Sequence, residues 1–149
     1  MSETQKRRKA VKQALHKYYL IEPRIKVIQQ EIAFKEKEME LIAAPTSQYK
    51  EGSRGTAQSS QVEGLAERRA AIRQEINNLR IELDHLALKR VRVDAALQYL
   101  RPDPLKMIKA KFFEGKTYME IGLDFCYSEK WARVNIAKIL DEMALMMGF

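Results

Sequence analysis

The sequence predicts an all-α protein, in which a long antiparallel helical hairpin or coiled coil is followed by a C-terminal three-helix helix-turn-helix domain. Three observations lead to this prediction. The 149 residues include six glycines, and none lies in residues 1–51 or 65–114, as expected of long uninterrupted helices. Strand-like alternation of apolar and polar residues is absent. Apolar residues instead recur at alternating intervals of three and four, the spacing that places them along one side of a helix.

Residues 1–42 are expected to form basic N-terminal helices. The apolar positions with three-four spacing are Ile25, Ile28, Ile32, Met39 and Ile42, with Lys35 in the gap, and Val11, Leu15 and Tyr18 continue the spacing upstream. Pro23 separates the two groups and predicts a kink or a break, because proline cannot donate the helical hydrogen bond.

Residues 43–64 are expected to be a mobile linker. Their composition shifts to Ser, Thr, Gln and Gly, with Pro45 near the start. Such a composition favours a flexible chain over a regular element.

Residues 65–101 predict one long coiled-coil helix. The seven-residue repeat consists of Leu65, Ile72, Leu79, Leu86, Val93 and Leu100, accompanied by Ile76, Leu83 and Leu97, and only Arg69 and Arg90 interrupt the second series. At about 1.5 Å per residue this helix is about 54 Å long, so its apolar seam needs another long helix. Residues 6–42 provide one in an antiparallel hairpin. Homodimerisation through residues 65–100 buries the same seam equally well, and a hairpin whose outer face dimerises combines both.

Residues 102–149 carry start and stop signals for three shorter helices. Pro102 ends the long helix, and Asp103 with Pro104 predicts an N-cap and first turn. Thr117 and Glu120 have the spacing of a capping box, and Ser128 has the character of an N-cap for a last helix that runs towards Gly148. Three short helices with a three-residue turn before the last describe a helix-turn-helix, whose second helix enters the DNA major groove by its amino-terminal end.

The expected DNA-facing side of the last helix follows from about 3.6 residues per turn. Its outward positions are Lys130, Arg133, Val134, Ala137 and Lys138. Lys130 and Arg133 are placed for base edges, and Ser128 and Lys138 for phosphate. Candidate contacts on the same module are Thr117, Tyr127 and Trp131, although an indole at the flank of such a helix more often packs against a neighbour. Gly122 is small enough to let the two helices cross closely.

The charge distribution adds a second candidate surface. The net charge is +7, and residues 1–30 hold eight Lys or Arg against two Glu, whereas residues 103–149 hold seven charges of each sign. Phosphate neutralisation governs DNA affinity, so a monomeric tail is poorly charged for tight binding. Dimerisation, or contacts from Arg7 and Arg8 in the basic arm, would compensate.

The C-terminal segment resembles a known family. Residues 112–122 read FFEGKTYMEIG and residues 127–131 read YSEKW, a run similar to the region-four helix-turn-helix of sigma factors. The layout as a whole is similar to phage late-operon transcriptional regulators of the ArpU and RinA type. This resemblance implies a phage or prophage activator that binds DNA upstream of late genes and works with host RNA polymerase, with Ser128, Lys130, Arg133 and Lys138 as DNA-facing residues. Cys126 stands where that turn usually has glycine, which predicts either backbone strain or a different turn geometry. Asn135 replaces the usual apolar residue, which predicts either a slight rotation of the last helix or an amide at the helix junction.

Composition argues against an enzyme, a metalloprotein or a membrane protein. A single cysteine, Cys126, excludes an internal disulfide and a multi-cysteine zinc site. His16 and His85 lack the i, i+4 partner of a metalloprotease helix. No signal peptide or membrane span is visible, so we expect a bacterial cytoplasmic protein without a cofactor or metal. Two alternatives remain: a phage terminase small subunit that recognises packaging DNA, and a helical scaffold or polymerase-binding protein without DNA contact.

Overall fold

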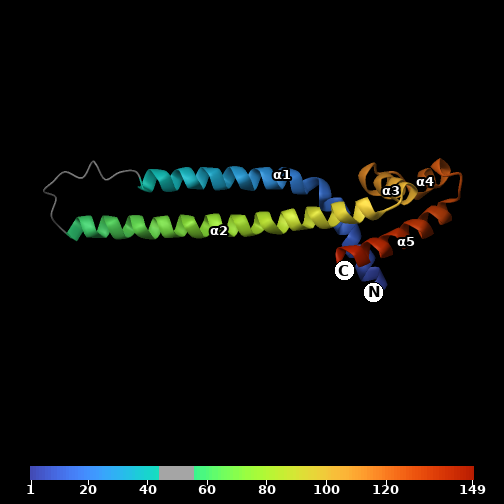
Figure 1. The fold of residues 1–149 in the computed structure, drawn as a ribbon, viewed down its shortest axis with the longest axis horizontal. Helices are drawn as coiled ribbons and strands as arrows, with labels where there is room; N and C mark the ends of the chain where they lie inside the picture. Colours follow the sequence, from blue (N-terminus) through green and yellow to red (C-terminus); the bar gives the residue numbers. More distant parts are fainter. Residues whose placement is uncertain (44–55) are drawn as a thin grey trace. The chain divides into compact units, whose positions relative to one another are not determined.

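The computed structural model describes residues 1–43 and 56–149. The two long helices are α1, Glu3–Ala43, and α2, Thr56–Tyr99, and the shorter ones are α3, Pro102–Ile108, α4, Tyr118–Asp124, and α5, Glu129–Met147 (Figure 1). A π-helical turn, η2, follows α3 over Lys109–Phe113. The described residues contain no strand, so the predicted all-α fold is confirmed.

The chain divides into two compact units. The hairpin unit is Arg24–Leu86, and the terminal unit combines Met1–Pro23 with Ala87–Phe149. Each of the two long helices therefore contributes a segment to both units.

The hairpin unit is an antiparallel pair of the second half of α1 and the first part of α2. Its core consists of Ile28, Ile32, Ile72 and Ile76, with Met39, Ile42, Leu79, Leu83 and Leu86 packed against it. Arg24 pairs with Glu82 near one end, and Arg68 pairs with Glu38 near the other, so chain positions run in opposite directions along the two helices. The predicted apolar seams thus close within one chain.

The terminal unit is built around the largest core of the described residues. Val11 and Leu15 of α1 and Val93 of α2 are buried with residues of all three shorter helices, among them Ile108, Ile121 and Ile136. At the edge of this core the Tyr18 hydroxyl donates to Asp94. This hydrogen bond and partial burial raise the pKa of Tyr18 to about 12.

Several element boundaries differ from the sequence prediction. Helix α1 continues through Pro23, so the predicted break is absent, and the alternative of a kink stays a prediction. Helix α2 begins at Thr56, so residues 56–64 of the predicted linker are helical, and 44–55 lie outside the described residues. Helix α3 has Arg101 as its N-cap and proline in its first turn, so the cap lies two residues before the predicted Asp103. Pro102 favours this start because it disfavours helical backbone at the preceding residue and fits the first helical position.

The π-helical turn was not predicted. Its closing bond runs from the Glu114 N–H to the Lys109 carbonyl, 2.9 Å apart, and Gly115 follows with a φ of 71°. The wider turn keeps Phe112 and Phe113 half-buried against the core of the terminal unit.

Candidate nucleic-acid interface

Helix α4 begins with a side-chain cap from Thr117. The Thr117 Oγ1 accepts from the Glu120 N–H at 3.2 Å, which satisfies one of the free donors at the helix start. The Glu120 carboxylate accepts from the Thr117 hydroxyl, also at 3.2 Å. The predicted capping box is therefore only half correct, since the carboxylate bonds to the threonine side chain.

A tight turn of Phe125, Cys126 and Tyr127 joins α4 to α5. Cys126 has a φ of 62°, in the left-handed region that side chains other than glycine rarely adopt. The Tyr127 N–H donates to the Gly122 carbonyl at 2.7 Å. The strain that Cys126 predicted is thus present in the backbone, and the turn is held in place by a bond back to α4.

Gly122 of α4 lies close to the backbone of the turn and of the N-cap that precede α5. A Cβ at this position would lie 2.6 Å from the Ser128 carbonyl oxygen and 2.9 Å from the Tyr127 carbonyl oxygen. Both atoms belong to the backbone, so neither can rotate away. The prediction that a small residue is needed here agrees with this geometry.

Helix α5 has one buried and one exposed side. Its N-cap Ser128 accepts from the Trp131 N–H at 3.1 Å, and it ends at Gly148, whose φ is 80°. The buried side consists of Ala132, Ile136, Ile139, Leu140, Met143, Ala144 and Met147. Of the residues predicted to face outward, Lys130, Arg133, Val134 and Lys138 are exposed and Ala137 is half-buried. Helix α5 therefore presents a polar, mainly basic side along its first half.

Arg133 has two close neighbours on this surface. Its guanidinium pairs with Glu129, one turn earlier, at 2.8 Å, and lies 5.4 Å from the centroid of the Tyr118 ring of α4. The Lys111 ammonium lies 4.2 Å from the centroid of the same ring. Tyr118 thus brings a lysine of η2 and an arginine of α5 to one aromatic ring. Lys111 was not among the site residues predicted from the sequence. The one sequence signal that could have indicated it is its position directly before Phe112 and Phe113.

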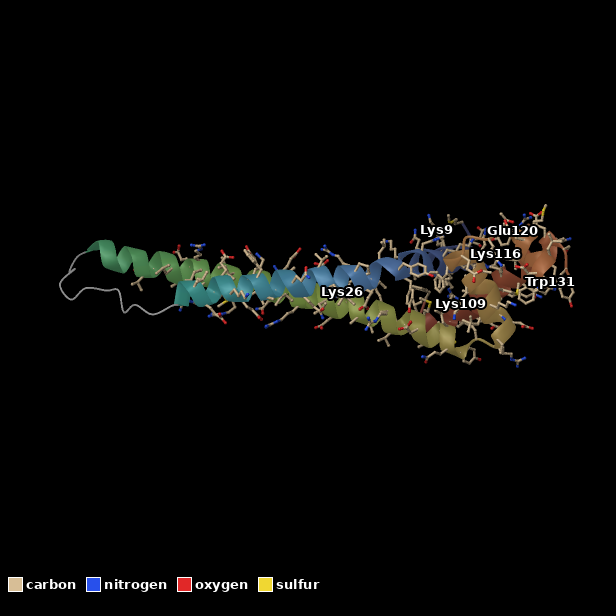
Figure 2. All side chains as sticks on the ribbon, turned by 90° about the horizontal axis from the view of Figure 1, so that it is seen from above. Lys9, Lys26, Lys109, Lys116, Glu120 and Trp131 are labelled. Carbon is tan, nitrogen blue, oxygen red and sulfur yellow. The ribbon has the colours of Figure 1, made fainter. Side chains whose placement is uncertain are left out.

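The aromatic residues of the turn pack against one another. Trp131 is half-buried and stacks on Tyr127, with ring centroids 4.1 Å apart, and Phe125 lies 5.9 Å from it on centroids. Asn135 donates from its side-chain amide to the Trp131 carbonyl at 2.8 Å, so the predicted amide at the junction serves the helix itself. Figure 2 labels Trp131 together with Lys116 and Glu120 in this part of the chain. The indole packs locally, while the exposed Tyr127 ring covers it.

The two arginines of the basic arm differ in their surroundings. Arg7 is exposed and lies 3.9 Å from Glu3. Arg8 donates two hydrogen bonds to the Asp141 carboxylate of α5, at 2.7 and 2.8 Å. These bonds hold the pKa of Asp141 below its usual range. Arg8 therefore fastens the start of α1 to α5 within the terminal unit.

Metal sites and membrane-spanning helices are both absent from the part of the chain that the structure describes. No cluster of His, Cys, Asp and Glu there has the arrangement of a metal site. None of the helices described is both long and apolar enough to cross a membrane.

No family model, curated protein or solved structure matches the chain.

Proposed function

We propose that the protein is a sequence-specific DNA-binding transcription regulator that inserts the first half of α5 into the major groove. The observation that carries this proposal is the exposed basic side of α5, opposite a side that is fully buried. A recognition helix needs both properties, since its base-contacting side must be free while its back is fixed to the domain. The close contact at Gly122 fixes the start of α5 against α4.

Within this proposal the basic residues have separate roles. Arg133 and Lys130 reach base edges, where an arginine or lysine recognises guanine through its two major-groove acceptors. Ser128 and Lys138 contact phosphate and set the register on the duplex. The ring of Tyr118 and the carboxylate of Glu129 orient the Arg133 side chain before DNA arrives. Arg8 is omitted from the DNA contacts because Asp141 already occupies its guanidinium.

The charge balance predicts moderate affinity for one copy of this surface. Residues 103–149 carry no net charge, and Glu129 places a carboxylate beside Arg133. Within this balance Lys111 lies over Tyr118, and the exposed Arg7, outside residues 103–149, supplies further positive charge. The resemblance to phage late-operon regulators suggests activation together with host RNA polymerase in the bacterial cytoplasm, without a cofactor.

The test is selection of binding sites from a random duplex library, followed by titration of the best site with the full chain. Arg133→Ala is expected to weaken binding by about 10- to 100-fold and to relax preference at one base pair, because a bidentate base contact is worth about 1–3 kcal/mol. The matched control is Arg73→Ala, since Arg73 is an exposed arginine of the hairpin unit. If Arg133→Ala keeps the full base preference, α5 is not the recognition helix.

Two further variants separate charge from recognition. Lys138→Ala should weaken binding equally on all sequences and lower the slope of affinity against salt by about one ion. Glu129→Gln should strengthen binding, because it removes a carboxylate from the surface that approaches phosphate. A chain with no salt-dependent affinity for any duplex would select the scaffold alternative.

A further inference from the structure

The second half of α1 carries a second apolar stripe on its exposed side. Val27, Phe34 and Leu41 follow one another at intervals of seven residues, and their exposed fractions are 44%, 71% and 77%. None of them belongs to the seam that closes the hairpin, which on this helix uses residues such as Ile28 and Ile32. A surface helix ordinarily exposes single apolar side chains, whereas this one exposes three with a fixed repeat.

The repeat places the three side chains along one line of the helix. At about 100° per residue, seven residues return almost to the starting direction. The same rotation puts Phe34 about 140° from the middle of Ile28 and Ile32, on the far side from α2. The seam of a coiled coil has two positions in each heptad, and this repeat makes one of them apolar, while the position three residues further on holds Gln30 and Lys37. The stripe is therefore suited to another helix and not to a small ligand.

The two borders of the stripe differ in charge. Lys26 and Lys37 lie on the basic border, at about 60–80° from Phe34, and Glu31 and Glu38 lie on the acidic border, at about 40–60°. The acidic border also holds Arg24, at about 80°, whose guanidinium pairs with Glu82 of α2. Lys26 and Lys37 have no ion pair among the described residues, and neither does Glu31. Glu38 pairs with Arg68. Lys26 projects from α1 in the hairpin unit (Figure 2).

We infer that this stripe binds the same stripe of a second copy of the chain, with the two α1 helices parallel and in register. A two-fold axis along the helices sets the acidic border of each copy against the basic border of the other. Lys26 and Glu31 are five residues apart, which is the separation of the charged pairs that flank the seam of parallel coiled coils. An antiparallel arrangement would instead place acidic border against acidic border. Self-complementary patches of this kind are what a two-fold dimer requires.

The first test measures the molecular mass of the full chain by sedimentation over a range of concentrations. The wild type should convert from monomer to dimer as concentration rises, and Phe34→Glu should weaken dimerisation at least 10-fold. The control is Ile81→Glu on α2, because Ile81 is also a large exposed residue, 55% exposed, outside the stripe. Circular dichroism verifies that both variants keep their helix content. A wild type that stays monomeric up to about 100 μM overturns the inference.

The second test exchanges the border charges. Lys26→Glu alone and Glu31→Lys alone should each weaken the dimer, since each sets like charges against one another across the interface. The double variant should recover the wild-type affinity, because it restores both pairs in reversed order. A double variant as weak as the two single variants would show that these borders do not face each other.

A third test reports the direction of the helices. In a Cys126→Ser background, Val27→Cys should form a disulfide with its own copy under mild oxidation, since a disulfide needs Cα atoms closer than about 7 Å. Efficient cross-linking only in a mixture of Val27→Cys and Leu41→Cys chains would refute the parallel register. These measurements use no DNA, so their outcome is independent of the proposed regulator function.

Discussion

Replacing Gly122 by alanine tests the claim that a close helix contact fixes the start of α5. The added Cβ would lie 2.6 Å from the Ser128 carbonyl oxygen and 2.8 Å from its carbonyl carbon. Inserting a methyl group into such a packed site typically costs about 1–3 kcal/mol, and the upper end applies because the neighbours are backbone atoms. Alanine recovers about 1 kcal/mol through its better helix propensity. The expected net loss is about 2 kcal/mol.

Urea unfolding followed by tryptophan fluorescence provides the assay. The chain has one tryptophan, and Trp131 stacks on Tyr127 in the turn that Gly122 contacts, so its emission reports on this junction. In a thermal scan the same loss corresponds to about 4–8 °C, given about 2–4 °C per kcal/mol for a chain of this size.

Gly64→Ala is the matched control. Gly64 lies in α2, and no atom comes within 4 Å of its added Cβ. This change should be neutral or stabilising by up to about 1 kcal/mol, from helix propensity alone. If Gly122→Ala unfolds at the same urea concentration as the wild type, the close contact does not constrain α5 and the reasoning fails.

Three further predictions concern strain, an ion pair and a partly buried hydrogen bond. Cys126→Gly should raise stability by up to about 1 kcal/mol, because glycine adopts a positive φ without the penalty of a Cβ, whereas lower stability in urea unfolding would contradict the strain at this turn. Arg8→Met should cost up to about 1 kcal/mol at pH 7, since the pair with Asp141 is partly exposed. The pair with Arg8 lowers the pKa of Asp141 in the folded state below its ordinary value of 3.8. The stability that the pair contributes is therefore complete above pH 3.8 and is lost as the pH falls through the folded-state pKa of Asp141. The stabilities of the wild type and Arg8→Met should consequently converge in acid. Tyr18→Phe should cost about 0.5–1.5 kcal/mol of stability at neutral pH. Because the pKa of Tyr18 is raised from 10.0 to about 12 in the folded state, the wild type should lose this advantage as the pH rises from 10 to 12. A stability difference that persists above pH 12 would contradict the role of this hydrogen bond.

Helix type and packing seams could be predicted from the sequence because they depend on periodicity. The residues expected in the seams, such as Ile28, Ile72 and Ile76, form the core of the hairpin unit. The caps at Thr117 and Ser128 are local as well, and both accept the expected backbone N–H. Patterns that need only a few neighbouring residues were therefore predictable.

Features that depend on tertiary contacts were not predictable in the same way. The passage of α1 through Pro23 as one helix goes against the local preference of proline, whereas the start of α3 follows the local preference of Pro102. The pairing of Arg8 with Asp141 joins residues 133 positions apart, and the approach of Lys111 to Tyr118 depends on a π-helical turn with no sequence signal. Charge counts along the chain could identify the basic arm, but they could not show that Arg8 of this arm pairs with Asp141.

The proline inside α1 has a consequence for how the helix opens. Pro23 has no N–H, so the carbonyl of Tyr19 lacks the intrahelical donor that every other interior position of an α-helix provides. Hydrogen exchange of backbone amides should therefore be fastest around this turn among the interior turns of α1. Because the boundary between the two units also falls at Pro23, local opening there interrupts the helix at the point where it passes from one unit to the other.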